Sequence, residues 1–491
     1  MKLNKLLNGV PVLHVSGNRQ VEIRGIACSS KKLMPRYLFA ALKGLEKDGF
    51  DYVKEALTKG AAAILSERPK LPEIKKSWIQ VYDSREALAL CSANFYDHPS
   101  HKMKMVGITG TKGKTTITYL LEEIIRRAGG VPGVIGTVSY RWPSFHTEAR
   151  MTTPEAPDMQ CMMKDMAEHG TTHCLIEVSS HSLEQKRVWG ISFDVAVFTN
   201  LSGEHLDYHH SMEDYFEAKK RLFSLNSKKR TAVVNEDDPW GKRLISELPM
   251  TTITFGLEPS ALVRGERYRF NGSGIEAIVR YPGGQTAISS SLTGKYNLYN
   301  ILAAFAIALA LNIPPQAIQE GIASLRQIPG RFEKIDNRLG LQIYVDYAHT
   351  DNALKNLLEA VRDLKPSRIL LIFGAGGDRD KSKRERMGEV AATYADWIFL
   401  TSDNPRSEDP LAIIQEIEKG ILKAGAKKYT VMPDRREAIE KALTFGKKGD
   451  YILVVGKGHE NYQILKNKTI SFSDAEVIKN ILKKLEPGQH G

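Results

Sequence analysis

The sequence has few cysteines, no long hydrophobic run and no low-complexity segment, and each absence excludes a class of protein. Four cysteines in 491 residues are too few for a disulfide framework, and none has the C-x-x-C spacing of zinc or dithiol sites. The longest uninterrupted apolar run, residues 301–311, is shorter than the ~18 residues that a membrane-spanning helix needs. Residues 1–13 are interrupted by Asn4, Asn8, Gly9 and Pro11, unlike the apolar core of a signal peptide. We therefore expect a cytoplasmic protein without membrane insertion.

The composition is that of a globular protein with an excess of positive charge. Hydrophobic residues make up 42% and charged residues 26%, and the formal net charge is +12. At ~150 residues per domain, the length suggests about three domains. A basic surface attracts nucleic acid, an anionic membrane or anionic small molecules, and net charge alone does not distinguish them.

The order of predicted elements indicates three α/β units. Strand-like runs at 21–27, 37–42, 61–65 and 78–82 precede a helix at 84–95. Strands at 105–109, 172–178, 195–199 and 230–235 then alternate with helices, and two helices with a break at Pro314-Pro315 cover 294–325. Further strands follow at 342–346, 368–373, 397–401 and 451–455. The alternation predicts largely parallel sheets, and we place the domains at 1–100, 101–329 and 330–491.

A glycine-rich segment between a predicted strand and helix has the features of a nucleotide-binding loop. Glycines let backbone N–H groups approach phosphate oxygens, a lysine supplies charge, and a hydroxyl at the helix start can bind magnesium. Ile108 stands where the strict pattern has its first glycine. The candidate nucleotide-binding residues are Gly110, Thr111, Lys112, Gly113, Lys114, Thr115 and Thr116.

Polar residues follow the later strands of the central unit. Glu177 ends one predicted strand, and His205 lies after the next, where parallel sheets bind ligands. The pair could hold magnesium, although histidine is an unusual ligand for it, and a structural role for the histidines fits the pattern equally well. By pattern alone, Lys219 would be a solvated lysine on a helix face.

Ten motifs are spread over nearly the whole chain. They are T-G-T-K-G-K-T-T at 109–116, Thr152-Thr153-Pro154, E-V-S-S-H-S-L at 177–183, H-L-D-Y-H at 205–209, Gly294/Asn297/Asn300, Gly330-Arg331-Phe332-Glu333, Asp346-Tyr347-Ala348-His349-Thr350, G-G-D-R-D-K at 376–381, D-N-P-R at 403–406 and G-K-G-H-E at 456–460. Taken together, these motifs resemble those of the Mur ligase family, whose members use ATP to add amino acids to the peptidoglycan precursor. The resemblance implies a small α/β N-terminal domain that binds UDP, a central P-loop-type parallel-sheet domain and a Rossmann-like C-terminal domain that binds the amino acid.

The resemblance also implies roles in an ATP-dependent ligation on UDP-N-acetylmuramoyl-L-alanyl-D-glutamate. Lys114, Lys219 and His205 would be catalytic, and Thr115, Glu177, His205 and Lys219 would hold two magnesium ions. Lys219 matches the lysine that the family carbamylates (N6-carboxylysine), which turns a cation into an anionic ligand. The remaining matches are Asn300, Arg331, Asp346 and His349 for ATP, and Ser30, Thr152, Thr153, Ser179, Gln185 and Arg187 for the muramoyl-dipeptide.

The added amino acid follows from the D-N-P-R motif. Family members that add meso-2,6-diaminopimelate carry this motif, and members that add L-lysine differ there. Diaminopimelate has a distal carboxylate, which the guanidinium of Arg406 would bind in a bidentate manner. The resemblance assigns the amino acid to Arg379, Asp403, Asn404, Pro405, Arg406, Gly456 and Glu460, with Glu460 free for the distal ammonium. L-lysine as the substrate is the alternative.

Other interpretations are weaker, and one part of the resemblance is altered. The family's D-S-R is Ser29-Ser30-Lys31 here, which puts the details of uridine binding in doubt. A basic P-loop protein acting on nucleic acid would need a recognition module, and none stands out. A folylpolyglutamate synthetase-like ligase would share the loop but not the D-N-P-R motif or the uridine domain. We expect a monomer that binds no nucleic acid.

Overall fold

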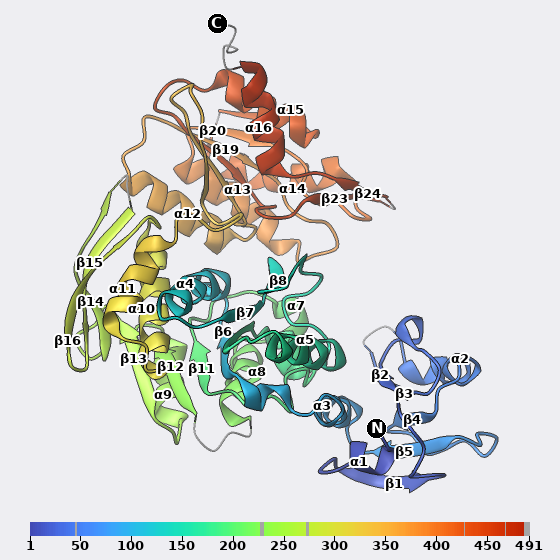
Figure 1. Cartoon of the computed structure of the whole chain (residues 1–491). Coiled ribbons are helices and arrows are strands. Elements are labelled where there is room, and N and C mark those ends of the chain that lie inside the picture. Colours follow the sequence, from blue (N-terminus) through green and yellow to red (C-terminus); the bar gives the residue numbers. More distant parts are fainter. Residues whose placement is uncertain (45–46, 226–229, 272–273, 427, 467, 486–491) are drawn as a thin grey trace, which may run out of the picture. The chain divides into compact units, whose positions relative to one another are not determined.

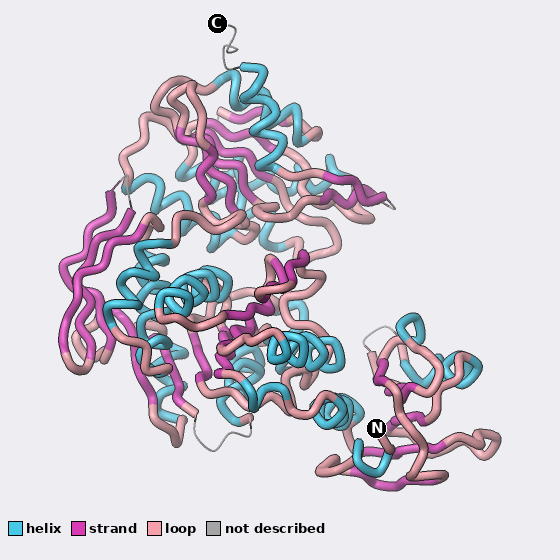
Figure 2. The backbone as a smooth tube through the Cα atoms, in the orientation of Figure 1, coloured by secondary structure: helices cyan, strands magenta, loops and turns pink. Residues whose placement is uncertain are grey.

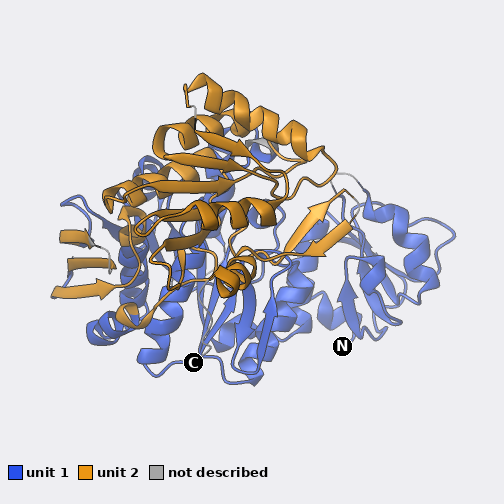
Figure 3. Cartoon of the chain, turned by 90° about the horizontal axis from the view of Figure 1, so that it is seen from above, with its two compact units in different colours: residues 1–264, 280–284, 300–321 blue, residues 265–279, 285–299, 322–491 orange. Residues whose placement is uncertain are grey.

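The computed structural model describes residues 1–44, 47–225, 230–271, 274–426, 428–466 and 468–485. Within these ranges the chain is an α/β protein, as predicted. It divides into two compact units, coloured separately in Figure 3: Met1–Arg264, Arg280–Gly284 and Asn300–Gly321 form one, and Gly265–Val279, Gln285–Tyr299 and Ile322–Gly491 form the other. No helix in the described part of the chain is both long and apolar enough to cross a membrane.

The N-terminal region of the first unit is a sheet with helices on both faces. Its elements are α1 (Leu3–Leu6), β1 (Val12–Ser16), β2 (Gly25–Ala27), β3 (Tyr37–Ala40), α2 (Val53–Thr58), β4 (Ala63–Ser66), β5 (Ser77–Val81) and α3 (Ser84–Phe95), with 3₁₀ turns at Ser30–Lys32, Gly49–Tyr52 and Pro99–Lys102. The strand order is β1-β5-β4-β3-β2, and only β1 is antiparallel to its neighbour. Leu38 and Leu65 face α1 and α3, whereas Phe39 and Ile64 face α2.

The central region of the first unit is a mainly parallel sheet. Its elements are β6 (Lys104–Thr109), α4 (Lys114–Arg127), β7 (Pro132–Ile135), β8 (Ser139–Trp142), β9 (Phe145–Glu148), α5 (Ala156–Glu168), β10 (His173–Glu177), α6 (Ser180–Glu184), β11 (Val195–Phe198), α7 (Leu206–His209), α8 (Met212–Ser224), β12 (Thr231–Asn235), α9 (Pro239–Glu247) and β13 (Thr252–Gly256). The order is β13-β12-β11-β6-β10-β7-β8-β9 (Figure 1), parallel from β13 to β7. The carboxyl ends of β11, β6 and β10 are therefore adjacent, where such sheets bind ligands.

Helices cover the central sheet and pack hydrophobic residues against its strands. One hydrophobic cluster joins α5, α6, α8 and α9 to strand residues such as Ile176 and Phe198. After β13 come β14 (Val263–Asn271), β15 (Gly274–Tyr281), β16 (Gly284–Ser290), α10 (Lys295–Ala310) and α11 (Pro315–Ser324). Helix α11 starts at the predicted Pro315, because proline is tolerated in the first helical turn. A Cβ atom at Gly321 of α11 would lie 2.4 Å from the Ile124 Cα of α4, so this helix contact requires glycine.

The C-terminal sheet lies in the second unit and is also mainly parallel. Its elements are β17 (Glu333–Ile335), β18 (Gln342–Asp346), α12 (Asp351–Asp363), β19 (Ile369–Phe373), α13 (Ser382–Tyr394), β20 (Trp397–Leu400), α14 (Pro410–Lys423), β21 (Tyr429–Val431), α15 (Arg435–Phe445), β22 (Tyr451–Val455), β23 (Tyr462–Leu465), β24 (Lys468–Ser471) and α16 (Asp474–Leu485). The order is β17-β18-β22-β19-β20-β21. Alternate strand residues pack against α12, α13 and α14 on one side and against α15 and α16 on the other. Figure 2 distinguishes the helices in cyan from the strands in magenta.

Most predicted elements are confirmed, with errors at the ends of strands. Helix 84–95 and strands 342–346 and 451–455 coincide with α3, β18 and β22. The strand predicted at 21–27 is wrong over its first half, and only Gly25–Ala27 is β2. The preceding residues pair with the start of the chain instead: the Leu3 and Ile23 N–H groups donate to Val21 O and Met1 O.

A fully buried ion pair holds the carboxyl-end side of the C-terminal sheet. The Arg435 Nε and Nη2 atoms lie 2.7 Å from the two carboxylate oxygens of Asp474, and neither side chain is exposed. Arg435 Nη2 also donates to the carbonyl of Val455, the last residue of β22, at 2.9 Å. The pair thus ties α15 and α16 to the strand that leads into Gly456.

We predict that Asp474→Asn destabilises the protein by about 3–5 kcal/mol, because it leaves a buried guanidinium without its counter-charge. Urea unfolding monitored by circular dichroism measures the change. The control is Glu476→Gln on the same helix, which removes an exposed pair with Lys479 at 3.1 Å and should cost about 1 kcal/mol or less. Equal midpoints for the two variants would contradict the prediction.

Candidate active site

The glycine-rich loop between β6 and α4 has the conformation that its sequence requires. Gly110 and Gly113 have φ angles of 140° and 92°, and Gly113 directly precedes α4. A Cβ at Gly110 would lie 1.9 Å from Thr199 Oγ1, and one at Gly113 would lie 2.3 Å from Asn300 Oδ1. Both positions therefore require glycine for space as well as for backbone conformation.

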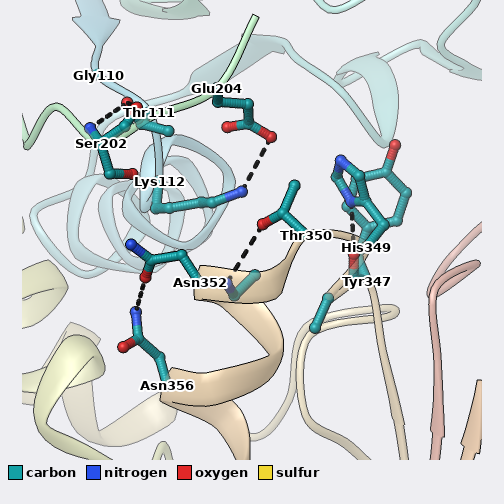
Figure 4. Close-up of polar contacts among 12 residues, drawn as sticks. Gly110, Thr111, Lys112, Ser202, Glu204, Tyr347, His349, Thr350, Asn352 and Asn356 are labelled. Carbon is teal, nitrogen blue, oxygen red and sulfur yellow. Dashed lines mark hydrogen bonds and ion pairs between the residues drawn. The ribbon is translucent and has the colours of Figure 1, made fainter. Parts of the chain in front are cut away.

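The loop is fixed by the segment that follows β11. The Thr111 N–H donates to Asn200 O at 2.8 Å, and the Lys112 N–H donates to Asn200 Oδ1 at 2.9 Å. The Lys112 ammonium pairs with Glu204 at 3.1 Å (Figure 4). Lys114 Nζ lies over the loop's own backbone, 2.7 Å from Gly110 O. A cation thus lies at the N-terminal end of α4, the end of a helix that favours anions.

Lys219 is buried beside this loop, so the prediction of a solvated lysine is wrong. Its side chain, on α8, is 1% exposed, and Nζ donates to Gly110 O at 3.0 Å. Nζ also lies 4.4 Å from the centre of the Tyr215 ring. Burial, followed by the charge of Lys114, lowers the pKa of Lys219 well below its usual value, while Glu204 opposes the shift. The environment therefore favours a neutral, nucleophilic amine.

Glu177, at the end of β10, is held by threonines. The carboxylate is 1% exposed and accepts a hydrogen bond from Thr115 Oγ1 at 3.0 Å. It also accepts from the Thr137 N–H at 3.0 Å and from Thr137 Oγ1 at 2.8 Å. Two of the residues predicted to bind metal, Thr115 and Glu177, are therefore in direct contact.

His205 is exposed and adopts a left-handed backbone conformation, with φ 60°. Although the residue as a whole is exposed, burial of its ring by the surrounding protein lowers its pKa to about 4, with Glu204 opposing and His181 adding to the shift. The rings of His181 and His205 lie edge to face, with their centres 5.0 Å apart. His205 is thus neutral at pH 7. Across the described ranges, no three His, Cys, Asp or Glu side chains form a group that could hold a metal ion.

The residues predicted to bind the muramoyl-dipeptide form one network, apart from Ser30. Thr153 Oγ1 donates to Glu177 O at 2.7 Å and accepts from the Ser179 N–H at 3.1 Å. Arg187 donates to Thr153 O at 3.0 Å and to Gln185 Oε1 at 2.6 Å. Thr152 Oγ1 lies 3.1 Å from Thr137 Oγ1. Ser30 is buried within the N-terminal sheet region, in the 3₁₀ turn Ser30–Lys32.

Three predicted ATP-side residues surround the end of β18 in the second unit. Asp346 accepts from the N–H groups of Phe332 and Ala348 at 2.7 and 2.8 Å. Burial raises the pKa of this carboxyl group, and the Arg331 charge opposes the rise. The Arg331 guanidinium lies 4.6 Å from the centre of the Tyr347 ring. His349 Nδ1 is 2.8 Å from Tyr347 O (Figure 4).

The predicted amino-acid residues gather at the ends of β20 and β22, and Glu460 is not free there. Its Oε2 atom accepts from Asn404 Nδ2 at 2.8 Å. The ammonium of Lys457, which is fully buried, lies 3.2 Å from the same oxygen and 3.3 Å from Asn404 Oδ1. A substrate ammonium would therefore share this carboxylate with Lys457. Gly456 has φ 111°, and a Cβ there would lie 2.5 Å from Asp403 Oδ2.

Arg406 is half-buried with a left-handed backbone, φ 52°. Its Nη1 atom donates to Gly377 O at 2.7 Å, and its N–H donates to Ile464 O at 3.1 Å. Pro405 is buried and Arg379 is exposed. Burial raises the pKa of Tyr462, and the charges of Glu460, Arg406, Asp403 and Arg379 also act on it, so these four charged residues lie near one tyrosine.

Sequence reasoning missed residues that position the predicted ones: Thr137, Asn200 and Lys457. Asn200 follows β11, and Lys457 follows β22 within the G-K-G-H-E motif. Because ligand sites lie at the carboxyl ends of parallel strands, their positions could have indicated both residues. Thr137 follows β7 outside any recognised motif, and nothing in the pattern distinguishes it from other loop threonines.

Comparison with known proteins agrees with this geometry. Family models match three successive parts of the chain: the catalytic domain of the Mur ligase family at 22–96, the Mur ligase middle domain at 108–308 and the Mur ligase glutamate ligase domain at 330–458. A protein of Geobacter metallireducens is 42% identical over the full length of both chains, and one of Caldanaerobacter subterraneus is 41% identical over 99% of this chain and 100% of its own. Both are named UDP-N-acetylmuramoyl-L-alanyl-D-glutamate–2,6-diaminopimelate ligase. A solved structure with that name superimposes with a TM-score of 0.70 and 29% identity over 99% of each chain.

The chain belongs to the Mur ligase family, as the motifs predicted, and it has the family's three-domain α/β fold. The domain boundaries near residues 100 and 330 stay predictions, to which the matched ranges are close.

Proposed function

We propose that the protein is an ATP-dependent ligase that joins meso-2,6-diaminopimelate to the D-glutamate γ-carboxylate of UDP-N-acetylmuramoyl-L-alanyl-D-glutamate. Two relatives, with 42% and 41% sequence identity to this chain, are named for this activity. The observation that carries the choice of amino acid is the half-buried Arg406. Its charge acts on Tyr462 together with that of Glu460, and Glu460 accepts a hydrogen bond from Asn404. A distal carboxylate suits this guanidinium, and a lone distal ammonium does not.

In this proposal the loop from Gly110 to Thr116 binds the phosphates of ATP. Backbone N–H groups at the start of α4 face the anion, and Lys114 exchanges its loop carbonyls for phosphate oxygens. Asn300, which lies against Gly113, completes the loop side. Arg331, Asp346 and His349 provide further ATP contacts, with the buried Asp346 suited to accept ribose or backbone hydrogen bonds.

The oxygen donors around Glu177 fit magnesium, and Lys219 can supply the further anionic oxygen ligand that the site needs. Hard cations such as magnesium prefer oxygen ligands, and Thr115 Oγ1 lies 3.0 Å from Glu177 Oε2. A second anionic oxygen group is needed, because His205 offers only a nitrogen. Carbamylation of Lys219 supplies it: the neutral amine adds to carbon dioxide, and the N–H proton leaves as the carbamate forms. Two magnesium ions bound by Thr115, Glu177, His205 and carbamylated Lys219 would neutralise charge on the transferred phosphoryl group.

The network around Thr153 is proposed to hold the muramoyl-dipeptide. Thr152, Thr153, Ser179, Gln185 and Arg187 surround the end of β10, next to Glu177, so a bound glutamate would approach the γ-phosphate. Ser30 is proposed to contact the uridine. The altered Ser29-Ser30-Lys31 sequence leaves lysine where the family has arginine, and a point charge replaces a planar fork there.

The reaction follows from this arrangement. The D-glutamate γ-carboxylate attacks the γ-phosphorus, ADP leaves and an acyl phosphate forms. The substrate amine then attacks the acyl carbon, and the tetrahedral intermediate expels phosphate as the C–N bond is completed. Lys114, with its cationic charge, stabilises the transferred phosphoryl group, which is mainly a task of positioning and charge neutralisation.

The same proposal accounts for part of the net charge of +12. The substrates carry a diphosphate, a triphosphate and several carboxylates, so cationic clefts need no nucleic acid to explain them. A peptidoglycan precursor made from nucleotide substrates places the enzyme in the cytoplasm. We further propose that it acts as a monomer.

We predict phosphate release from ATP only when both UDP-N-acetylmuramoyl-L-alanyl-D-glutamate and meso-diaminopimelate are present. With L-lysine in its place, kcat/KM should fall by at least about two orders of magnitude, because the half-buried guanidinium of Arg406 is left without its carboxylate. A coupled phosphate assay measures both rates. Equal or better turnover with L-lysine would establish the alternative substrate.

We predict that Arg406→Lys raises the KM for diaminopimelate by about tenfold or more and changes the KM for ATP by less than about twofold, because lysine keeps the charge and loses the bidentate fork. The control is Arg436→Lys, which alters an exposed arginine near the start of α15 that is not among the predicted site residues. Unchanged affinity for diaminopimelate in the Arg406 variant would show that this arginine does not bind the substrate.

A further inference from the structure

Arg384 is a fully buried arginine that belongs to none of the predicted motifs. It lies near the start of α13, and its side chain has no exposed surface. Its Nη1 atom is 2.9 Å from both Glu408 and Glu416, and Nη2 is 2.9 Å from Glu408. Nη2 also donates to Gly376 O at 3.2 Å. These hydrogen bonds to two carboxylates and a carbonyl fix the position of the buried guanidinium.

Glu408 extends this contact to the loop that follows β19. Its Oε1 atom accepts from the Asp378 N–H at 2.6 Å. Asp378 in turn accepts hydrogen bonds from the Ser407 hydroxyl at 2.5 Å and from the Ser407 N–H at 3.2 Å. The hydrogen bond from Arg384 lowers the pKa of Glu408 to about 2, so the carboxylate stays ionised at neutral pH. The loops at 376–381 and 403–408 are thus held together by a charged junction.

The junction fixes the backbone that orients Arg406. The Gly377 carbonyl receives Arg406 Nη1 at 2.7 Å, and the Gly377 N–H donates to Asn404 O at 2.9 Å. Asp378 and Arg406 both have φ 52°, a conformation that costs energy in non-glycine residues and persists only where surroundings hold it. A Cβ at Gly377 would lie 1.9 Å from Pro405 O, so the two loops are in backbone contact.

We propose that Arg384 is a positioning residue for recognition of the amino-acid substrate. Through Gly376 and Glu408 it holds the Gly377 carbonyl against the Arg406 guanidinium, and so fixes the direction in which Arg406 presents its fork to the distal carboxylate. This inference rests on the proposed function. It adds a residue outside the binding motifs that sets both the affinity for diaminopimelate and the discrimination against L-lysine.

The test is steady-state kinetics of Arg384→Met in the full chain with all three substrates varied in turn. We expect the KM for meso-diaminopimelate to rise roughly ten- to a hundredfold, because small displacements of a binding group have large effects. The KM values for ATP and the muramoyl-dipeptide should stay within about twofold, and the preference for diaminopimelate over L-lysine should fall. The control is Arg386→Met on the same helix, which removes an exposed contact with Asp351 at 2.8 Å and should leave all three KM values unchanged.

A second variant covers the case in which Arg384→Met fails to fold. Ser407 is exposed, and Ser407→Ala removes the hydroxyl's hydrogen bond to Asp378 while the one from the Ser407 N–H remains. It should raise the KM for diaminopimelate in the same direction by a smaller factor. Suppose that the parent turns over diaminopimelate, but that Ser407→Ala and any folded Arg384→Met have the parent's KM for it. The positioning role of Arg384 is then overturned, and the proposed function stands. A parent that does not turn over diaminopimelate overturns the proposed function and this inference together.

Discussion

The burial of one lysine beside a phosphate loop is the constraint on which the candidate active site depends. Lys219 has 1% of its surface exposed; burial and the charge of Lys114 lower the pKa of its ammonium group, and the charge of Glu204 opposes the shift only in part. A buried ammonium without a counter-ion is unfavourable, so the site favours the neutral amine. The same amine lies 3.0 Å from Gly110 O, at the loop proposed to bind ATP. The fold thus places a neutral amine where the proposed magnesium site would need an anionic ligand.

The two mainly parallel sheets bring the chemistry to the ends of their strands. In the first unit β11, β6 and β10 are neighbours, so Asn200, the loop and Glu177 meet at one edge. In the second unit β18, β22, β19 and β20 run parallel, and Asp346, the Gly376 loop, Asn404 and Gly456 follow their ends. Hydrogen bonds between loops, rather than regular structure, then set the final positions, as between Arg406 and Gly377.

The sequence allowed the fold class and most elements to be predicted, because buried parallel strands are continuous apolar runs bounded by glycine and polar residues. The motifs also identified most of the residues that gather around Glu177 and Tyr462. Pattern alone could not reveal the burial of Lys219, since a lysine on a helix is usually solvated and only the fold covers this one. It also could not reveal that the Glu460 carboxylate contacts the Lys457 ammonium, or that Arg384 contacts Gly376 O and Glu408 in the loops at 376–381 and 403–408. Such contacts depend on the three-dimensional fold, and motif spacing does not predict them.

The central claim is that Lys219 becomes an anion, and its most direct test is carbon-13 NMR of the protein equilibrated with carbon-13 bicarbonate. The account predicts an enriched carbamate carbonyl signal in the parent protein. The signal should persist in Lys220→Met, where a neighbouring lysine paired with Glu247 at 2.6 Å is lost, and should vanish in Lys219→Met. An active parent protein that shows no carbamate signal, or a signal that survives Lys219→Met, would contradict the account.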